Sequence, residues 1–122
     1  MSGPLEGLRV IEMGSLIAGP FCGQLMGDMG ADVIKIEAPG EGDPMRQWGQ
    51  GAKPAWWRVI GRNKRSVSLD LRKPRGQEIA RELAAGADIL IENFRPGKSG
   101  QVRLLQEFLP ELPGNAKSQG TL

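Results

Sequence analysis

The sequence has no histidine and a single cysteine, Cys22, among its 122 residues. Without histidine it cannot form a Ser–His or Cys–His catalytic pair, nor a metal site built on imidazole, and it lacks the commonest general base. A lone cysteine excludes an intrachain disulfide, which is typical of a protein from a reducing compartment. Because Cys22 lies among apolar residues, we expect a buried, unreactive thiol rather than a nucleophile.

Long apolar runs and dense charge of one sign are also missing. No stretch approaches the roughly 18 apolar residues of a membrane span, and the amino terminus lacks the pattern of a secretory signal. The net charge is only +2, without a basic tract of the kind that binds nucleic acid. With 39% hydrophobic and 25% charged residues, the chain can build one ordinary core. We expect a cytoplasmic protein that binds neither nucleic acid nor membranes.

Short apolar runs alternate with amphipathic segments along the first two thirds of the chain. The runs 8–13, 32–37, 66–71 and 87–92 predict buried strands. Helices are predicted between Pro20 and Gly30 and from Pro74 to about Ala87. One apolar face of the first helix consists of residues at a spacing of four, Phe21, Leu25 and Met29. Alternation of strand and helix predicts an α/β fold with a parallel sheet and flanking helices.

Two stretches interrupt this pattern. Residues 38–62 are rich in glycine and proline, predict a long loop without an element of its own, and contain Trp48, Trp56 and Trp57. These tryptophans are either buried anchors or a contact surface, and contact with a partner subunit or a ligand is the favoured interpretation. Residues 98–122 could include one short apolar helix face, but their polar, proline-bearing remainder predicts a divergent, disordered tail behind an α/β domain at 1–97.

Ligands of open α/β sheets bind at the carboxyl ends of the strands, and three turns qualify. The turn at 14–19 carries glycines that could present N–H groups to a phosphate, although glycines also serve a merely tight turn. The turn at 93–97 offers an amide, a ring and a guanidinium, Asn93, Phe94 and Arg95, which could hold an adenine or a pantetheine arm or simply form a structural turn.

The turn at 70–73 leads into a helix start that breaks two local rules. Pro74 places Lys73 at the N-cap, yet lysine has no oxygen to accept an amide N–H. Arg72, Lys73 and Arg75 also put positive charge at the positive end of the helix dipole. A bound anion such as a nucleotide phosphate would offset both defects, whereas a solvated, salt-screened helix end is the alternative.

Taken in order, several segments resemble the family III CoA-transferases, which include acyl-CoA racemases. The matching segments run from about Leu5 to Gly97 and comprise 4–10, 18–22, 30–37, 42–46, 62–66, 69–71 and 92–97. The resemblance implies a Rossmann-like large domain, here incomplete, and a homodimer of interlocked chains in the full-length protein. It also implies transfer of coenzyme A from an acyl-CoA to a small carboxylic acid, without a metal.

In the chemistry that the resemblance implies, an aspartate attacks the acyl-CoA thioester to give a mixed anhydride. The coenzyme A thiolate then forms an aspartyl-CoA thioester, which the acceptor carboxylate opens. The family's catalytic aspartate lies beyond the resembling part, and no aspartate follows Asp88 here. We therefore expect no catalytic residue in this chain, and a fragment that is inactive alone.

By the same resemblance, three segments should contact coenzyme A. They are Ile17–Ala18, the run Leu69, Asp70, Leu71 and Arg72, and the run Asn93, Phe94 and Arg95. Two positions depart from the family pattern. Ala38 stands where many relatives have an arginine for the nucleotide, and Lys73-Pro74-Arg75-Gly76 replaces the usual Thr-Pro-Glu-Gly.

Other interpretations remain open. The chain could be a non-catalytic coenzyme-A-binding or interaction module, or a fragment of an acyl-CoA racemase. A dinucleotide-dependent oxidoreductase with Glu37 on the ribose is disfavoured, because Leu16 occupies the second glycine position of the Gly-x-Gly-x-x-Gly fingerprint.

Overall fold

The computed structural model describes residues 3–49 and 55–94. In this part of the chain, four parallel strands form one sheet in the order β3-β2-β1-β4. The strands are β1 (Arg9–Glu12), β2 (Asp32–Glu37), β3 (Lys64–Ser68) and β4 (Ile89–Ile91). The helices are α1 (Ala18–Asp28), the short 3-10 helix η1 (Pro44–Gln47), α2 (Ala55–Ile60) and α3 (Pro74–Ala85). The predicted α/β fold with a parallel sheet is confirmed.

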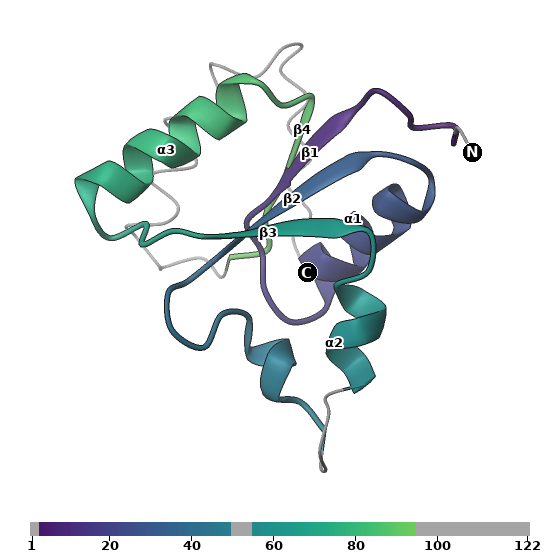
Figure 1. Ribbon diagram of the computed structural model, residues 1–122, viewed down its shortest axis with the longest axis horizontal. Helices are drawn as coiled ribbons and strands as arrows, with labels where there is room; N and C mark the ends of the chain where they lie inside the picture. Colours follow the sequence, from purple (N-terminus) through teal and green to yellow (C-terminus); the bar gives the residue numbers. More distant parts are fainter. Residues whose placement is uncertain (1–2, 50–54, 95–122) are drawn as a thin grey trace.

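Helices cover the sheet on both faces (Figure 1). Helix α3 lies on one face, and α1 with α2 lies on the other. Alternate residues of β1 and β2 therefore enter two separate clusters. Ile11, Ile34 and Ile36 pack with Ala80 and Ala84 of α3, whereas Val10 and Val33 pack with Ala31 and Ile91 on the α1 side. Both faces of the central strands are buried, as a parallel sheet requires.

Helix α1 turns a face of small residues, not its large apolar ones, toward the sheet. Its buried residues are Gly19, Pro20, Gly23, Gln24 and Gly27. Phe21, Leu25 and Met29, which the spacing of four grouped on one apolar face, are between 41% and 48% exposed. These three residues do share one face of the helix, but that face points outward. The opposite face, which carries the glycines, lies against the strands, because residues without a Cβ allow a close approach.

Cys22 is partly buried and packs against the cluster of Val10, Ala31 and Val33. This position agrees with the packing role expected of an apolar thiol. It is less enclosed than the sequence predicted.

The stretch at 38–62 is more structured than predicted, since it contains η1 and α2. Trp57 packs under Arg46, whose guanidinium carbon lies 3.9 Å from the ring centroid. Trp48 and Trp56 are 43% and 58% exposed. Trp57 is therefore a partly buried anchor. Trp48 and Trp56 are exposed, as a contact surface requires.

Two further boundaries differ from expectation. Strand β3 begins at Lys64 and ends at Ser68, so Leu69–Leu71 follows the strand instead of ending it. The predicted tail at 98–122 lies outside the described residues, as does Arg95. Within residues 3–49 and 55–94, no helix has the length and hydropathy needed to cross a membrane.

Candidate functional site

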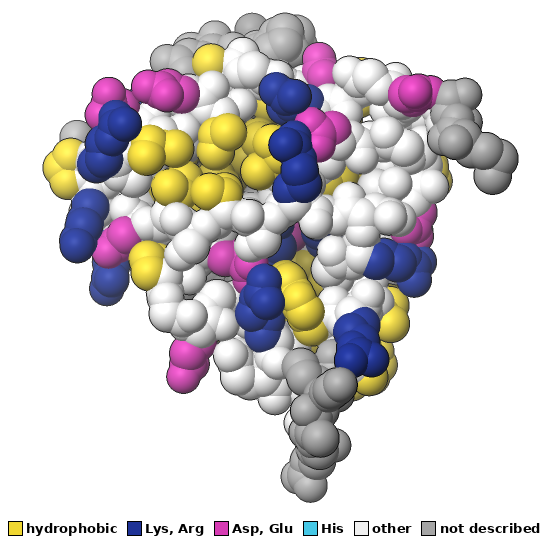
Figure 2. Space-filling model, in the orientation of Figure 1, with side chains coloured by type: hydrophobic (Ala, Val, Ile, Leu, Met, Phe, Trp, Pro, Cys, Tyr) yellow, Lys and Arg dark blue, Asp and Glu magenta, His cyan; other side chains and the backbone are white. Residues whose placement is uncertain are grey.

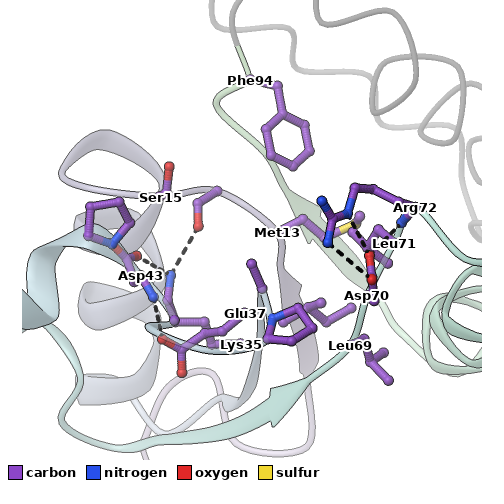
Figure 3. A pocket seen from close by; sticks show the side chains of 16 residues that line it. Met13, Ser15, Lys35, Glu37, Asp43, Leu69, Asp70, Leu71, Arg72 and Phe94 are labelled. Atoms are coloured by element: carbon purple, nitrogen blue, oxygen red, sulfur yellow. Dashed lines mark hydrogen bonds and ion pairs between the residues drawn. The ribbon is translucent and has the colours of Figure 1, made fainter.

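A cavity of about 470 Å³ opens at the carboxyl edge of the sheet. Residues that end or follow all four strands contribute to its wall. The lining segments are 13–15, 35–39, 42–44, 69–72 and Phe94. Figure 3 shows Phe94 at the top of the view, Arg72 with Asp70 at the right, and Lys35 with Asp43 at the left. This is the edge at which open α/β sheets bind ligands, and the volume is that of a typical small-molecule site.

A buried lysine organises the base of the cavity. Lys35 Nζ lies 2.6 Å from Glu12 Oε2 and 2.8 Å from Asp43 Oδ2, and it donates to the carbonyl oxygen of Gly14 at 3.0 Å. The side chains of Lys35, Glu12 and Asp43 are at most 1% exposed. Glu12 and Lys35 are register partners on the neighbouring strands β1 and β2, so the sheet itself sets this pair. Buried charges are tolerated only with such partners.

A second lysine extends the network away from the cavity. Lys64 Nζ donates to Glu12 Oε1 at 2.6 Å and to the carbonyl oxygen of Pro20 at 2.7 Å. Burial lowers the pKa of Lys64, and the Glu12 carboxylate only partly opposes that effect. Glu12 therefore bridges two ammonium groups. Gly23 leaves the space for this carboxylate, because a Cβ there would overlap Glu12 Oε1.

Glu37, at the end of β2, fixes the loop beside the cavity. Its carboxylate accepts hydrogen bonds from the N–H of Asp43 at 2.8 Å, from Arg46 at 2.8 and 2.6 Å, and from the hydroxyl of Ser66. Burial alone would raise the pKa of Glu37, but these donors outweigh it and lower the pKa to about 2. Both oxygens are thus engaged within the protein, which disfavours a ribose-binding role for Glu37.

The outer rim of the cavity, which we define as residues 70–75, carries exposed charge. The Arg72 side chain is 87% exposed and folds back on Asp70, with 3.0 Å between Nε and Oδ1. The pKa of Asp70 is lowered by hydrogen bonds from the side chain and the N–H of Arg72. Lys73 is the N-cap of α3, has no side-chain capping bond, and precedes Pro74 at the first helical turn. The unusual helix start expected from the sequence is confirmed.

The charged side chains of the cavity wall and of the rim differ in whether they can interact with a ligand. Two cations, Lys35 and Arg72, and three carboxylates, Glu37, Asp43 and Asp70, line the cavity. Lys35 is enclosed by its two carboxylates. An anionic ligand would therefore meet positive charge at the exposed rim, at Arg72 and Lys73, rather than at the base.

The structure brings five of the nine predicted ligand-binding residues to this cavity. Leu69, Asp70, Leu71, Arg72 and Phe94 line it. Asn93 lies directly beside the wall, where its side chain bonds the backbone of Ser15. Ile17 and Ala18 are exposed at the start of α1 and are not part of the lining, and Arg95 lies outside the described residues.

Sequence reasoning missed the polar base of the cavity. Lys35, Glu37 and Asp43 line it, and Glu12 supports it from below. A signal was present, because a lysine inside the apolar run 32–37 and a glutamate inside the run 8–13 must find partners when both faces of a sheet are covered. Nothing in the spacing indicated that Asp43, in an irregular stretch, is the third member.

Known proteins are similar to this chain in sequence and in fold. The model of CoA-transferase family III matches residues 5–112, so the likeness continues past Gly97, where the motifs alone placed its end. Succinyl-CoA–D-citramalate CoA-transferase of Chloroflexus aurantiacus is 53% identical over 97 residues, which are 77% of this chain and 24% of that protein. Human succinyl-CoA:glutarate CoA-transferase is 39% identical over 112 residues, 89% of this chain and 26% of that protein.

A solved structure agrees. The crystal structure of a CAIB/BAIF family protein from Brucella suis superposes with a TM-score of 0.82 at 38% identity, covering 93% of this chain and 32% of that one. The chain thus spans about a quarter of the length of the curated relatives it matches. On the family match over most of its length, the chain belongs to CoA-transferase family III.

Proposed function

We propose that this chain forms the coenzyme-A-binding part of a family III CoA-transferase, which moves coenzyme A between an acyl-CoA and a small carboxylic acid. The observation that carries the proposal is the cavity at the carboxyl edge of a sheet whose sequence belongs to this family. The relatives' names specify succinyl-CoA as donor and citramalate or glutarate as acceptor. A short dicarboxylate system is therefore the substrate class that we propose for the full-length protein, together with a homodimeric assembly.

The residues present fit a phosphorylated thiol carrier in two zones. Leu69, Leu71 and Phe94 offer apolar surface for a pantetheine arm in the cavity. Arg72 and Lys73 offer exposed cations for nucleotide phosphates at the rim. Ala38 supplies no charge at the position where the family pattern has an arginine. Under this proposal Arg72 and Lys73 contribute a larger share of the phosphate affinity than they would beside such an arginine.

We further propose that the chain binds coenzyme A without turning it over. The resemblance puts the catalytic aspartate after the matched motifs, and no aspartate follows Asp88 among the 122 residues. The carboxylates that line the cavity are engaged with Lys35, Arg46 or Arg72. We propose none of these carboxylates as the nucleophile, since the family resemblance assigns that role to an aspartate outside the matched segments.

Calorimetric titration of the 122-residue chain tests the binding claim. We expect heat on titration with coenzyme A, and weaker binding of pantetheine, which lacks the nucleotide phosphates. Arg72→Ala should weaken coenzyme A binding about tenfold, because a charge-assisted hydrogen bond to phosphate is lost. Arg58→Ala, an exposed arginine on α2 away from the cavity, is the matched control and should bind like the wild type. Absence of heat at millimolar coenzyme A would overturn the proposal.

An acyl-CoA exchange assay tests the second claim. Succinyl-CoA is incubated with the chain and labelled glutarate, and labelled glutaryl-CoA is measured. We expect none above the rate without protein. Product formation that depends on the chain would show that a nucleophile is present after all.

A further inference from the structure

The turn between β1 and α1, residues 14–17, forms part of the cavity wall in a conformation it would not adopt alone. Leu16 has φ +66°, in the left-handed region that side chains other than glycine rarely occupy. Such a residue costs about 1–2 kcal/mol, so the surroundings must hold it in place. Ser15, its neighbour, lines the cavity.

Asn93, which follows β4 and is 78 residues distant from Ser15 in the chain, holds one side of the turn. The N–H of Ser15 donates to Asn93 Oδ1 at 2.9 Å, and Asn93 Nδ2 donates to the carbonyl oxygen of Ser15 at 2.9 Å. The Asn93 amide thus satisfies both the N–H and the carbonyl group of Ser15, as a neighbouring β-strand residue can. Gly14 makes room for it, since a Cβ at Gly14 would overlap Asn93 Oδ1.

Asp43 holds the other side of the same turn. Its Oδ1 accepts from the N–H of Leu16 at 3.2 Å and from the N–H of Met45 at 2.9 Å. Its Oδ2 lies 2.8 Å from Lys35 Nζ, which also binds the carbonyl oxygen of Gly14. Successive backbone N–H groups, those of Ser15 and Leu16, are therefore held by two segments that meet only in the folded protein.

We propose that Asn93 and Asp43 are positioning residues that clamp the turn at 14–17, in which Leu16 adopts the left-handed conformation. Through Ser15, which lines the cavity, Asn93 can then affect a ligand without contacting it. The glycine at position 14, which from sequence could have served a phosphate, provides the slot for the Asn93 amide. Any effect on coenzyme A affinity rests on the proposed function, whereas the clamp itself does not.

Amide hydrogen exchange of the 122-residue chain, measured residue by residue by NMR, tests the clamp without a ligand. Asn93→Ala should lower the protection of the Ser15 amide about fivefold to tenfold, the equivalent of one lost hydrogen bond. Gln47→Ala is the matched control, because the Gln47 amide also donates to a backbone carbonyl, that of Glu41 at 3.2 Å, and Gln47 does not line the cavity. In this control the protection of the Ser15 and Leu16 amides should not fall more than that of other amides.

Two further variants keep the test decisive. Asn93→Asp retains an acceptor for the Ser15 N–H and loses only the donor, so it should give an intermediate loss even if the alanine variant does not fold. In a Leu16→Gly background the left-handed φ needs no clamp. Asn93→Ala should therefore lower the protection of the Ser15 amide less in this background than in the wild type. Equal effects in both backgrounds, or unchanged Ser15 protection in Asn93→Ala, would overturn the proposal.

Coenzyme A titration of the same variants separates this inference from the proposed function. We expect affinity to fall in Asn93→Ala in parallel with the loss of Ser15 protection. Loss of affinity with intact protection would mean that Asn93 contacts the ligand directly, contrary to our inference. A wild type that binds no coenzyme A would refute the proposed function, and the exchange data would still decide whether the clamp exists.

Discussion

Two charged clusters, each with members that line the cavity, differ in almost every physical respect. The base, which we define as Glu12, Lys35, Asp43 and Lys64, consists of side chains at most 2% exposed that neutralise one another across β1, β2 and β3. The outer rim, residues 70–75, consists of exposed groups whose contacts are local, such as Arg72 with Asp70. On the molecular surface, Lys and Arg side chains flank the apolar patch that gathers over the region of α3 (Figure 2).

The difference teaches which charges can serve a ligand. Removing a buried charge strands its partner in a medium of low polarity, so the base is part of the fold. An exposed ion pair contributes little to stability, so the rim can be rearranged at small cost. The same residue types thus build the cavity in one place and remain available to an anion in the other.

The largest expected effect comes from breaking the base. Lys35→Met keeps the length of the side chain but leaves Glu12 and Asp43 buried without their shared cation. We expect a loss of about 3–5 kcal/mol in the free energy of unfolding, measured by urea denaturation.

The matched control is Arg65→Met on the neighbouring strand β3. This substitution removes the ion pair between Arg65 and Asp32, in which the Arg65 side chain is 64% exposed. It should cost less than about 1 kcal/mol. Similar losses in the two variants would show that burial does not distinguish the regions.

Acid should act next most strongly, through Glu37. Its pKa is about 2 in the folded protein against an ordinary 4.5. Because the folded pKa is the lower one, the contribution is fully present above pH 4.5 and is lost as pH falls toward 2. The shift corresponds to about 3 kcal/mol, and Glu37 is only 6% exposed.

Urea denaturation between pH 6 and pH 2.5 measures this contribution. Glu37→Gln, which cannot titrate, should be less stable than the wild type at pH 6 and should flatten the pH dependence over that window. An equally steep pH dependence in the glutamine variant would assign the acid sensitivity to other groups.

The comparison also explains how much the sequence could foretell. The four strands and the helices α1 and α3 rest on local periodicity and on residues such as Pro74, so their order was predictable, whereas η1 and α2 lie in a stretch for which no element was predicted. The rim was predictable too, because Lys73 at an N-cap violates a rule that concerns only adjacent residues. The base was predictable only in part, since a lysine and a glutamate in buried runs must find partners, whereas Asp43 lies in an irregular stretch that gives no local signal.

Helix α1 shows the same limit in another form. Periodicity correctly put Phe21, Leu25 and Met29 on one face, but it could not tell that the opposite face, with Gly23 and Gly27, meets the sheet. Hydrophobicity predicts which face prefers burial, but here the glycine face is buried, with Gly23 directly beside the Glu12 carboxylate.

The smallest expected effect is a gain in stability at the rim, from a substitution of Lys73. Lys73→Asp supplies the missing N-cap acceptor and replaces a cation with an anion at the positive end of the α3 dipole. We expect the free energy of unfolding to rise by about 1 kcal/mol. Coenzyme A affinity, measured by calorimetry, should fall about tenfold, because a phosphate partner becomes a repelling carboxylate.

Two companion variants divide the gain between its causes. Lys73→Ser adds a capping oxygen without negative charge and should keep most of the added stability, whereas Lys73→Met removes the cation without adding a cap and should keep little of it. If Lys73→Asp gained stability and bound coenzyme A as well as the wild type, Lys73 would have no part in the phosphate site. If it lost stability, a contact of the native lysine would outweigh the cap, and the rim would belong to the fold as the base does.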